Sequence, residues 1–87
     1  MKTLEKLAVS AEQAASRDGM RIIGPLGVYK RGLFFYASLA DGEGGAVGLP
    51  LAYWVDLDTG EARLCTTEES DLLTERWFLA SLGPVPD

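Results

Sequence analysis

The run from Val47 to Leu57 is the feature of this sequence that most restricts how the chain can fold. Apolar side chains occupy every second position of the run: Val47, Leu49, Leu51, Tyr53, Val55 and Leu57. Successive side chains of a β-strand point to opposite faces, so this spacing indicates a strand with one strongly buried face. We therefore expect a strand over residues 47–56 in a sheet that has a covered face.

Residues 21–29 and 33–40 are rich in β-branched and aromatic side chains, which favour two further strands. Lys30-Arg31-Gly32 lies between them and is typical of a hairpin turn in which Gly32 accepts a positive φ. Gly24-Pro25 interrupts the first segment, and proline is normally confined to the ends, edges or bulges of strands. We expect the first strand to be short, bent or at an edge of the sheet.

Turn residues at 56–60 lead into a returning strand over 61–66. Helices are predicted before and after the strands. In residues 3–17 apolar positions, many of them Ala, recur at helical spacing, and Gly19 ends the helix. Thr66 and Glu69 have the spacing of a capping box and predict a helix over 68–82. The apolar face of that helix contains Leu72, Leu73, Trp77 and Ala80.

These elements predict one α+β domain over residues 1–87, with an N-terminal helix, an antiparallel meander sheet of about four strands and a C-terminal helix. The 87 residues are 47% hydrophobic and 24% charged, which is typical of a single globular domain. Glu5, Lys6 and Glu12 interrupt any apolar segment of a signal peptide, and no apolar stretch approaches the ~20 residues that cross a bilayer. We expect a cytoplasmic protein without a membrane partner.

The sequence contains no His, so it cannot assemble a Ser/His/Asp or Cys/His catalytic arrangement. Cys65 is the single cysteine and has no cysteine or histidine partner for a zinc site or a redox pair. A buried small hydrophobic role is expected for it. The glycines between 42 and 48 lack the Lys-Ser/Thr of a phosphate loop, so neither a cofactor nor a metal is predicted.

Asp58-Thr59-Gly60 resembles the signature of retroviral-type aspartic proteases, in which two subunits each contribute one Asp. Glu61 stands where those proteases have a small residue, and a third carboxylate there would disturb the shared proton. Asp56, Asp58 and Glu61 also suggest a calcium cluster, but the spacing of a calcium-binding loop is missing. An ordinary hairpin turn, with Asp side chains bonded to turn amides, explains the same residues.

Charge is unevenly distributed along the chain, whose net charge is −5. Residues 1–39 carry six basic and three acidic side chains, whereas residues 40–87 carry two basic and ten acidic ones. Nucleic-acid affinity comes mainly from neutralising phosphates, so this balance argues against a DNA or RNA partner. An acidic surface can instead be a solvated face or a recognition face for a basic protein.

Consecutive aromatic residues place large rings on both sides of the predicted sheet. If the helices cover one side, Phe34, Tyr36 and Trp54 form an apolar patch on the other, a usual feature of protein-binding surfaces. The alternative is that the second helix or a second copy of the chain covers these rings.

Three segments together resemble a small bacterial domain family. They are Arg-Gly-Leu-Phe-Phe-Tyr-Ala-Ser at 31–38, Gly-Leu-Pro at 48–50 and Trp-Val-Asp-Leu-Asp-Thr-Gly-Glu-Ala-Arg at 54–63, followed by a Thr-rich entry into a helix. The order of elements over nearly the whole chain is similar to the YrhB / immunity protein 35 family. The resemblance implies a non-enzymatic cytoplasmic domain, in some members an immunity factor that binds and blocks a toxin.

The resulting hypothesis is a small acidic protein-binding module of immunity-like function. Two alternatives stay open: a structural homodimer whose subunits cover each other's sheet, and an aspartic-protease-like dimer that uses Asp58. The predicted binding residues combine the aromatic patch with the acidic second half of the chain: Phe34, Tyr36, Trp54, Asp56, Asp58, Glu61, Glu68, Glu69 and Asp71.

Overall fold

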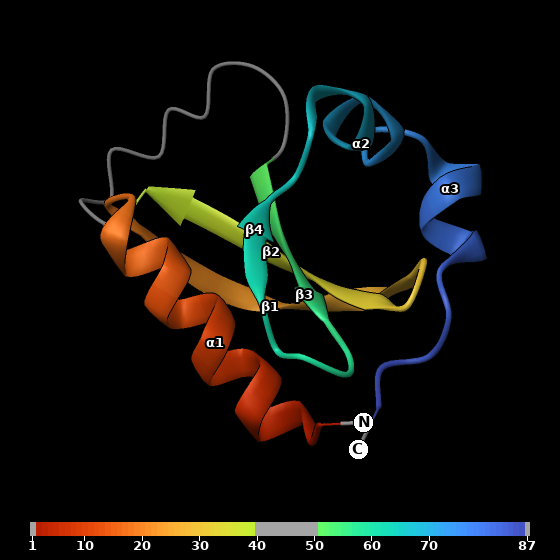
Figure 1. The fold of residues 1–87 in the computed structure, drawn as a ribbon. Helices are drawn as coiled ribbons and strands as arrows, with labels where there is room; N and C mark the ends of the chain where they lie inside the picture. Colours follow the sequence, from red (N-terminus) through yellow and green to blue (C-terminus); the bar gives the residue numbers. More distant parts are fainter. Residues whose placement is uncertain (1, 40–50, 87) are drawn as a thin grey trace.

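The computed structural model describes residues 2–39 and 51–86. Over these ranges the elements are α1 (Leu4–Arg17), β1 (Met20–Tyr29), β2 (Gly32–Leu39), β3 (Leu51–Asp56), β4 (Ala62–Leu64), α2 (Thr67–Leu72) and α3 (Arg76–Ser81). The strands form an antiparallel meander in the order β1-β2-β3-β4 (Figure 1). The predicted α+β class is therefore confirmed.

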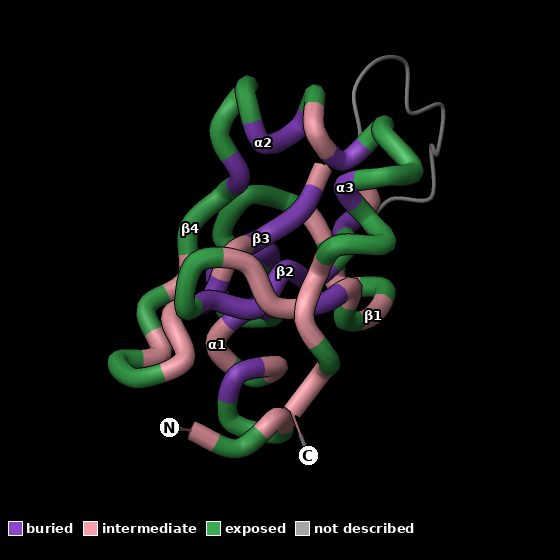
Figure 2. Tube along the Cα trace, turned by 90° about the vertical axis from the view of Figure 1, so that its right-hand side faces the viewer, coloured by how far each residue is buried: buried purple, intermediate pink, exposed green. Residues whose placement is uncertain are grey.

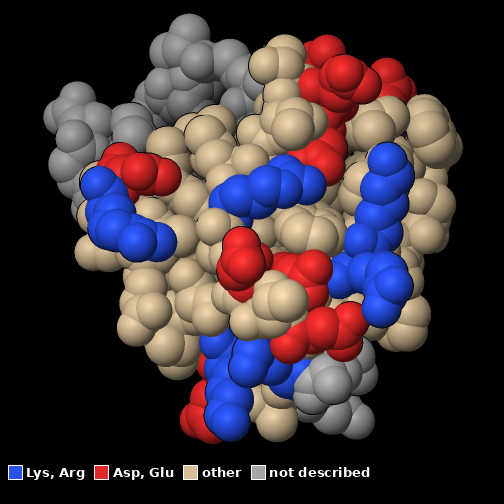
Figure 3. All heavy atoms as spheres, in the orientation of Figure 1, with Lys and Arg blue, Asp and Glu red and all other residues tan. Residues whose placement is uncertain are grey.

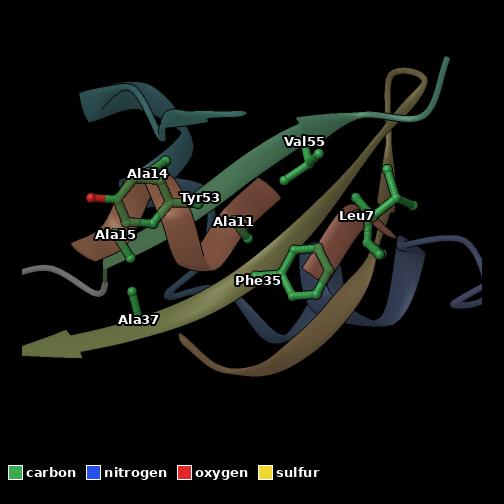
Figure 4. Close-up of a cluster of buried hydrophobic side chains, with 9 residues drawn as sticks. Leu7, Ala11, Ala14, Ala15, Phe35, Ala37, Tyr53 and Val55 are labelled. Atoms are coloured by element: carbon green, nitrogen blue, oxygen red, sulfur yellow. The ribbon is translucent and has the colours of Figure 1, made fainter. Parts of the chain in front are cut away.

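Helix α1 packs on one face of the sheet, where it forms the first of two cores. Small Ala side chains on α1 bring its backbone close to the rings of Phe35 and Tyr53 (Figure 4). Buried positions concentrate in β2 and β3 between the outer layers (Figure 2). The buried residues of this core are Leu7, Ala11, Ala14, Ala15, Leu33, Phe35, Ala37, Tyr53 and Val55.

The second core lies on the opposite face of the sheet, under α2 and α3 (Figure 1). The Tyr29 ring stacks on Phe34 at 5.7 Å between centroids and meets Phe78 edge-on at 5.1 Å. Cys65 is buried in this core, as predicted. Helices thus cover both faces of the sheet, so the expectation that Phe34 lies on an open face is wrong: its side chain is fully buried.

The prediction of a single helix over 68–82 is wrong, because the helix is interrupted between α2 and α3. Thr74 Oγ1 donates a hydrogen bond to the backbone carbonyl of Asp71 at 2.7 Å. Glu75 then has an extended backbone, with φ −98° and ψ 125°. A Thr hydroxyl that bonds to the preceding turn gives the backbone an alternative to continued helix.

The break also changes which side chains of this region are buried. In one continuous helix, Leu73 and Phe78 would point about 140° apart around the axis, since each residue turns about 100°. In the structure both are buried in the second core. Trp77, expected on the buried face, is 62% exposed, and Ala80 is exposed as well.

Strand β1 is bent and lies at an edge of the sheet, as predicted, but at ten residues it is not short. Its register with β2 skips Ile23 and Leu26, so two bulges flank the Pro25 region. Near its end, Val28 and Gly83 exchange two backbone hydrogen bonds of 3.0 and 2.9 Å. The segment after α3 thus covers part of this edge.

In the β1–β2 turn, the residues that adopt positive φ are not the one that was predicted. Lys30 and Arg31 have φ of 50° and 65°, whereas Gly32 lies outside the left-handed region. Positive φ at both central residues is the type I′ geometry of two-residue hairpins. Gly32 is needed for a different reason: a Cβ there would overlap the indole ring of Trp54. That ring also donates its Nε1–H to the Tyr29 carbonyl at 2.8 Å.

The other strands agree with prediction where they are described. Strand β3 is described from Leu51, and residues 47–50 of the predicted strand lie outside the described residues, as does the end of the predicted 33–40 strand. Strand β4 is three residues long, shorter than the predicted 61–66. Among the described helices, none is long and apolar enough to cross a membrane.

We predict that Gly32→Ala destabilises the fold by about 1–3 kcal/mol, because the added methyl group would overpack against the Trp54 ring. Gly24→Ala is the matched control, since a Cβ on this strand glycine meets nothing within 4 Å. It should change the unfolding free energy by less than about 0.5 kcal/mol. Urea unfolding of both variants checks this, and equal effects would show that the ring contact is not the cause.

Candidate functional site

A surface hollow of about 320 Å³ lies at the β3–β4 hairpin, and we call it the hairpin hollow. Trp54 and Asp56 alternate with buried residues of β3 and so lie on the sheet face opposite α1. Glu61 and Arg63 lie across the hairpin from them. The hollow therefore combines three predicted site residues, Trp54, Asp56 and Glu61, with lining residues that were not predicted: Thr59, Ala62 and Arg63.

Arg63 connects the hollow to α2. Its guanidinium lies over the Trp54 ring, 4.6 Å from the ring centroid. Its Nη1 and Nη2 donate to the two carboxylate oxygens of Glu69 at 2.8 and 3.1 Å. Bidentate pairing and stacking on an aromatic face are both characteristic of arginine. The stack could have been found from the sequence, because the hairpin register places residue 63 opposite residue 54.

Glu69 is 8% exposed, and its carboxylate forms hydrogen bonds within the protein. Besides the pair with Arg63, its carboxylate accepts the Thr66 backbone N–H, and the Thr66 hydroxyl accepts the Glu69 N–H. This is the predicted capping box at the start of α2. The Arg63 guanidinium, with help from Thr66, holds the pKa of Glu69 below its usual value.

The tip of the hairpin is built by Asp56. Its Oδ1 accepts the backbone N–H groups of Asp58 and Thr59 at 2.8 and 2.9 Å. These two bonds lower the pKa of Asp56, Thr59 contributing most. Gly60 follows with φ 79°, a conformation that favours glycine. The turn interpretation of the Asp-Thr-Gly segment is therefore confirmed.

Asp58, the residue of the aspartic-protease alternative, lies on the outside of this turn. Its carboxylate accepts a hydrogen bond from Arg31 Nη2 at 3.1 Å. This carboxylate therefore forms an ion pair with an arginine, whereas a protease dyad needs two Asp side chains that share a proton. The arrangement suits an exposed ion pair between the two hairpin turns.

The remaining predicted site residues are spread over the surface. Tyr36 is 39% exposed on β2, and Trp54 is partly buried, so the predicted aromatic patch is reduced. Glu68 and Asp71 are exposed on α2, away from the lining of the hollow. On the face drawn in Figure 3, Lys and Arg side chains lie between the groups of acidic ones. The acidic residues are therefore grouped rather than continuous on this face.

Over residues 2–39 and 51–86, no group of three or more His, Cys, Asp or Glu side chains could hold a metal ion. Comparisons with protein families, curated proteins and solved structures found nothing that matches this chain. Function is therefore inferred from the geometry of the hairpin hollow and from the exposed side chains.

We predict that Glu69→Gln destabilises the fold more at neutral pH than at pH 3. A carboxylate whose pKa is lowered in the folded state contributes stability above its unfolded pKa of about 4.3. That contribution is lost as the pH falls through the lower folded value. The difference in unfolding free energy between wild type and variant should therefore shrink on acidification.

Urea unfolding at pH 7 and pH 3 measures this difference. Glu68→Gln, an equal charge change on the neighbouring exposed residue, should have a small effect at both pH values. The pKa of Asp56 is also lowered in the folded state, so its carboxylate likewise stabilises the fold less at low pH. The unfolding free energy of every variant therefore keeps some pH dependence. A Glu69→Gln effect of the same size at both pH values would contradict the role given to the Arg63 pair.

Proposed function

We propose that the chain is a small, non-enzymatic, cytoplasmic protein-binding module that recognises a basic surface on another protein. The observation that carries the proposal is the hairpin hollow, in which an aromatic side chain and two acidic ones meet at the surface. Aromatic residues are enriched at protein interfaces, and complementary charge steers partners together. The resemblance to the immunity protein family makes a toxin the proposed partner.

Not every predicted acidic residue is equally suited to this role. Glu69 and Asp58 are engaged by Arg63 and Arg31, and Asp56 holds the hairpin turn. Glu61, Glu68 and Asp71 are exposed, the first at the hollow and the other two on α2. The exposed acids are therefore the ones whose charge a partner would meet.

We predict that affinity capture from a lysate of the source cell recovers one basic protein at low salt and loses most of it at high salt, because exposed charges are screened. The double variant Glu61→Gln, Glu68→Gln should recover several-fold less of it. The control Glu5→Gln, Glu12→Gln removes the same charge from exposed positions of α1, on the other face of the sheet, and should bind like wild type. Mass spectrometry identifies the bound protein.

Two results would contradict the proposal in different ways. Equal recovery with both double variants would show that the acidic residues of the hairpin and α2 do not steer binding. Recovery of the bait alone, at either salt concentration, would count against a protein-binding module and favour a homodimer.

The homodimer is the second candidate function, and exposed apolar side chains favour it. Trp77 on α3 is 62% exposed, and Ile23 at a bulge of β1 is 63% exposed. Protein interfaces are enriched in aromatic side chains, so the exposed Trp77 is the residue through which a second copy would bind. A dimer formed through α3 should persist at nanomolar concentration in sedimentation velocity, and Trp77→Lys should dissociate it. A monomer over the whole concentration range would contradict this candidate.

A further inference from the structure

We infer that the hairpin hollow receives one arginine side chain from a partner protein. This inference rests on the proposed function, because it takes the cation to come from a protein. The hollow measures about 320 Å³, at the small end of the ~300–1,000 Å³ range of ligand sites. It is therefore suited to a group the size of a single long side chain.

The charges around the hollow favour a cation. Asp56, Glu61 and Arg63 are its ionisable lining residues among those that the structure describes. Arg63 directs both terminal nitrogens to Glu69, which compensates its charge. Arg31 also acts on Asp56 but is itself paired with Asp58, so the carboxylates of Asp56 and Glu61 leave the hollow with a negative charge that attracts a cation and repels an anion.

The polar and apolar lining matches arginine better than a compact ammonium. A planar guanidinium presents paired N–H donors that fit a carboxylate such as Glu61 in a bidentate way. Its aliphatic stem can pack on the edge of Trp54 and on Ala62. Arg63 already lies 4.6 Å over the Trp54 ring, which shows that this face of the sheet accommodates a guanidinium beside the indole.

The experiment is an NMR titration of the intact chain with N-acetyl-arginine amide, a single cationic side chain without a peptide. Trp54 reports from the wall of the hollow through its indole N–H. Trp77 is an internal control, because its exposed indole lies on α3 and does not line the hollow. We expect a saturable shift of the Trp54 signal in the millimolar range and no comparable shift of Trp77.

Neutral and variant controls test the cause of the binding. N-acetyl-citrulline amide has nearly the same shape without the charge and should shift Trp54 at least tenfold less at equal concentration. Glu61→Gln should weaken arginine binding several-fold, and Glu12→Gln on α1 should leave it unchanged. Asp56→Asn keeps an oxygen acceptor for the turn amides and should also weaken binding, and its unchanged spectrum elsewhere would verify the fold.

Three results would overturn the inference: equal shifts of both Trp signals, equal binding of citrulline and arginine probes, or no effect of Glu61→Gln. Tighter binding of N-acetyl-lysine amide would also overturn it, because arginine is the proposed occupant. A protein captured from the lysate without probe binding would overturn this inference and leave the proposed function standing. Probe binding without any captured protein would instead overturn the proposed function.

Discussion

The contact between the Trp54 ring and the backbone of Gly32 is the constraint on which the outer face of the sheet depends. The ring lies where a side chain at position 32 would stand, and its N–H bonds to the Tyr29 carbonyl, so β3 is fastened to the first hairpin. Arg63 of β4 lies over the same ring and pairs with Glu69 of α2. The contacts of the Trp54 ring thus extend to both of these elements. The wall of the hairpin hollow is one end of this chain of contacts.

Much of the fold could be predicted because its signals are local. Alternation in the run that contains Tyr53 and Val55 indicated both the strand and its buried face, and turn residues located the hairpins. The break after α2 could not be predicted this way, because the apolar spacing within residues 68–82 is that of one continuous helix. The burial of both Leu73 and Phe78 against Phe34 depends on the distant strand β2, and this packing outweighs the local pattern.

The candidate site likewise contains residues whose placement follows from local sequence and residues whose placement depends on distant elements. Trp54, Asp56 and Glu61 were predicted and lie together, because one short hairpin holds them at fixed register. Glu69 and Phe34 were predicted as surface residues and are buried, because their partners come from other elements: Arg63 of β4 and Phe78 of α3. Charge and aromatic character can be recognised from sequence, but whether they face a partner or a neighbouring element is decided by tertiary contacts.

The backbone bridge between Val28 and Gly83 determines when one edge of the sheet becomes covered during synthesis of the chain. These residues are far apart in the sequence, and the backbone bonds between them can form only after residue 83 has left the ribosome. Until then the end of β1 presents unpaired backbone groups to other nascent chains. An open edge of this kind is a template for unwanted strand pairing. Its two bulges, which bend the strand next to Pro25, already make that edge a poor template during synthesis.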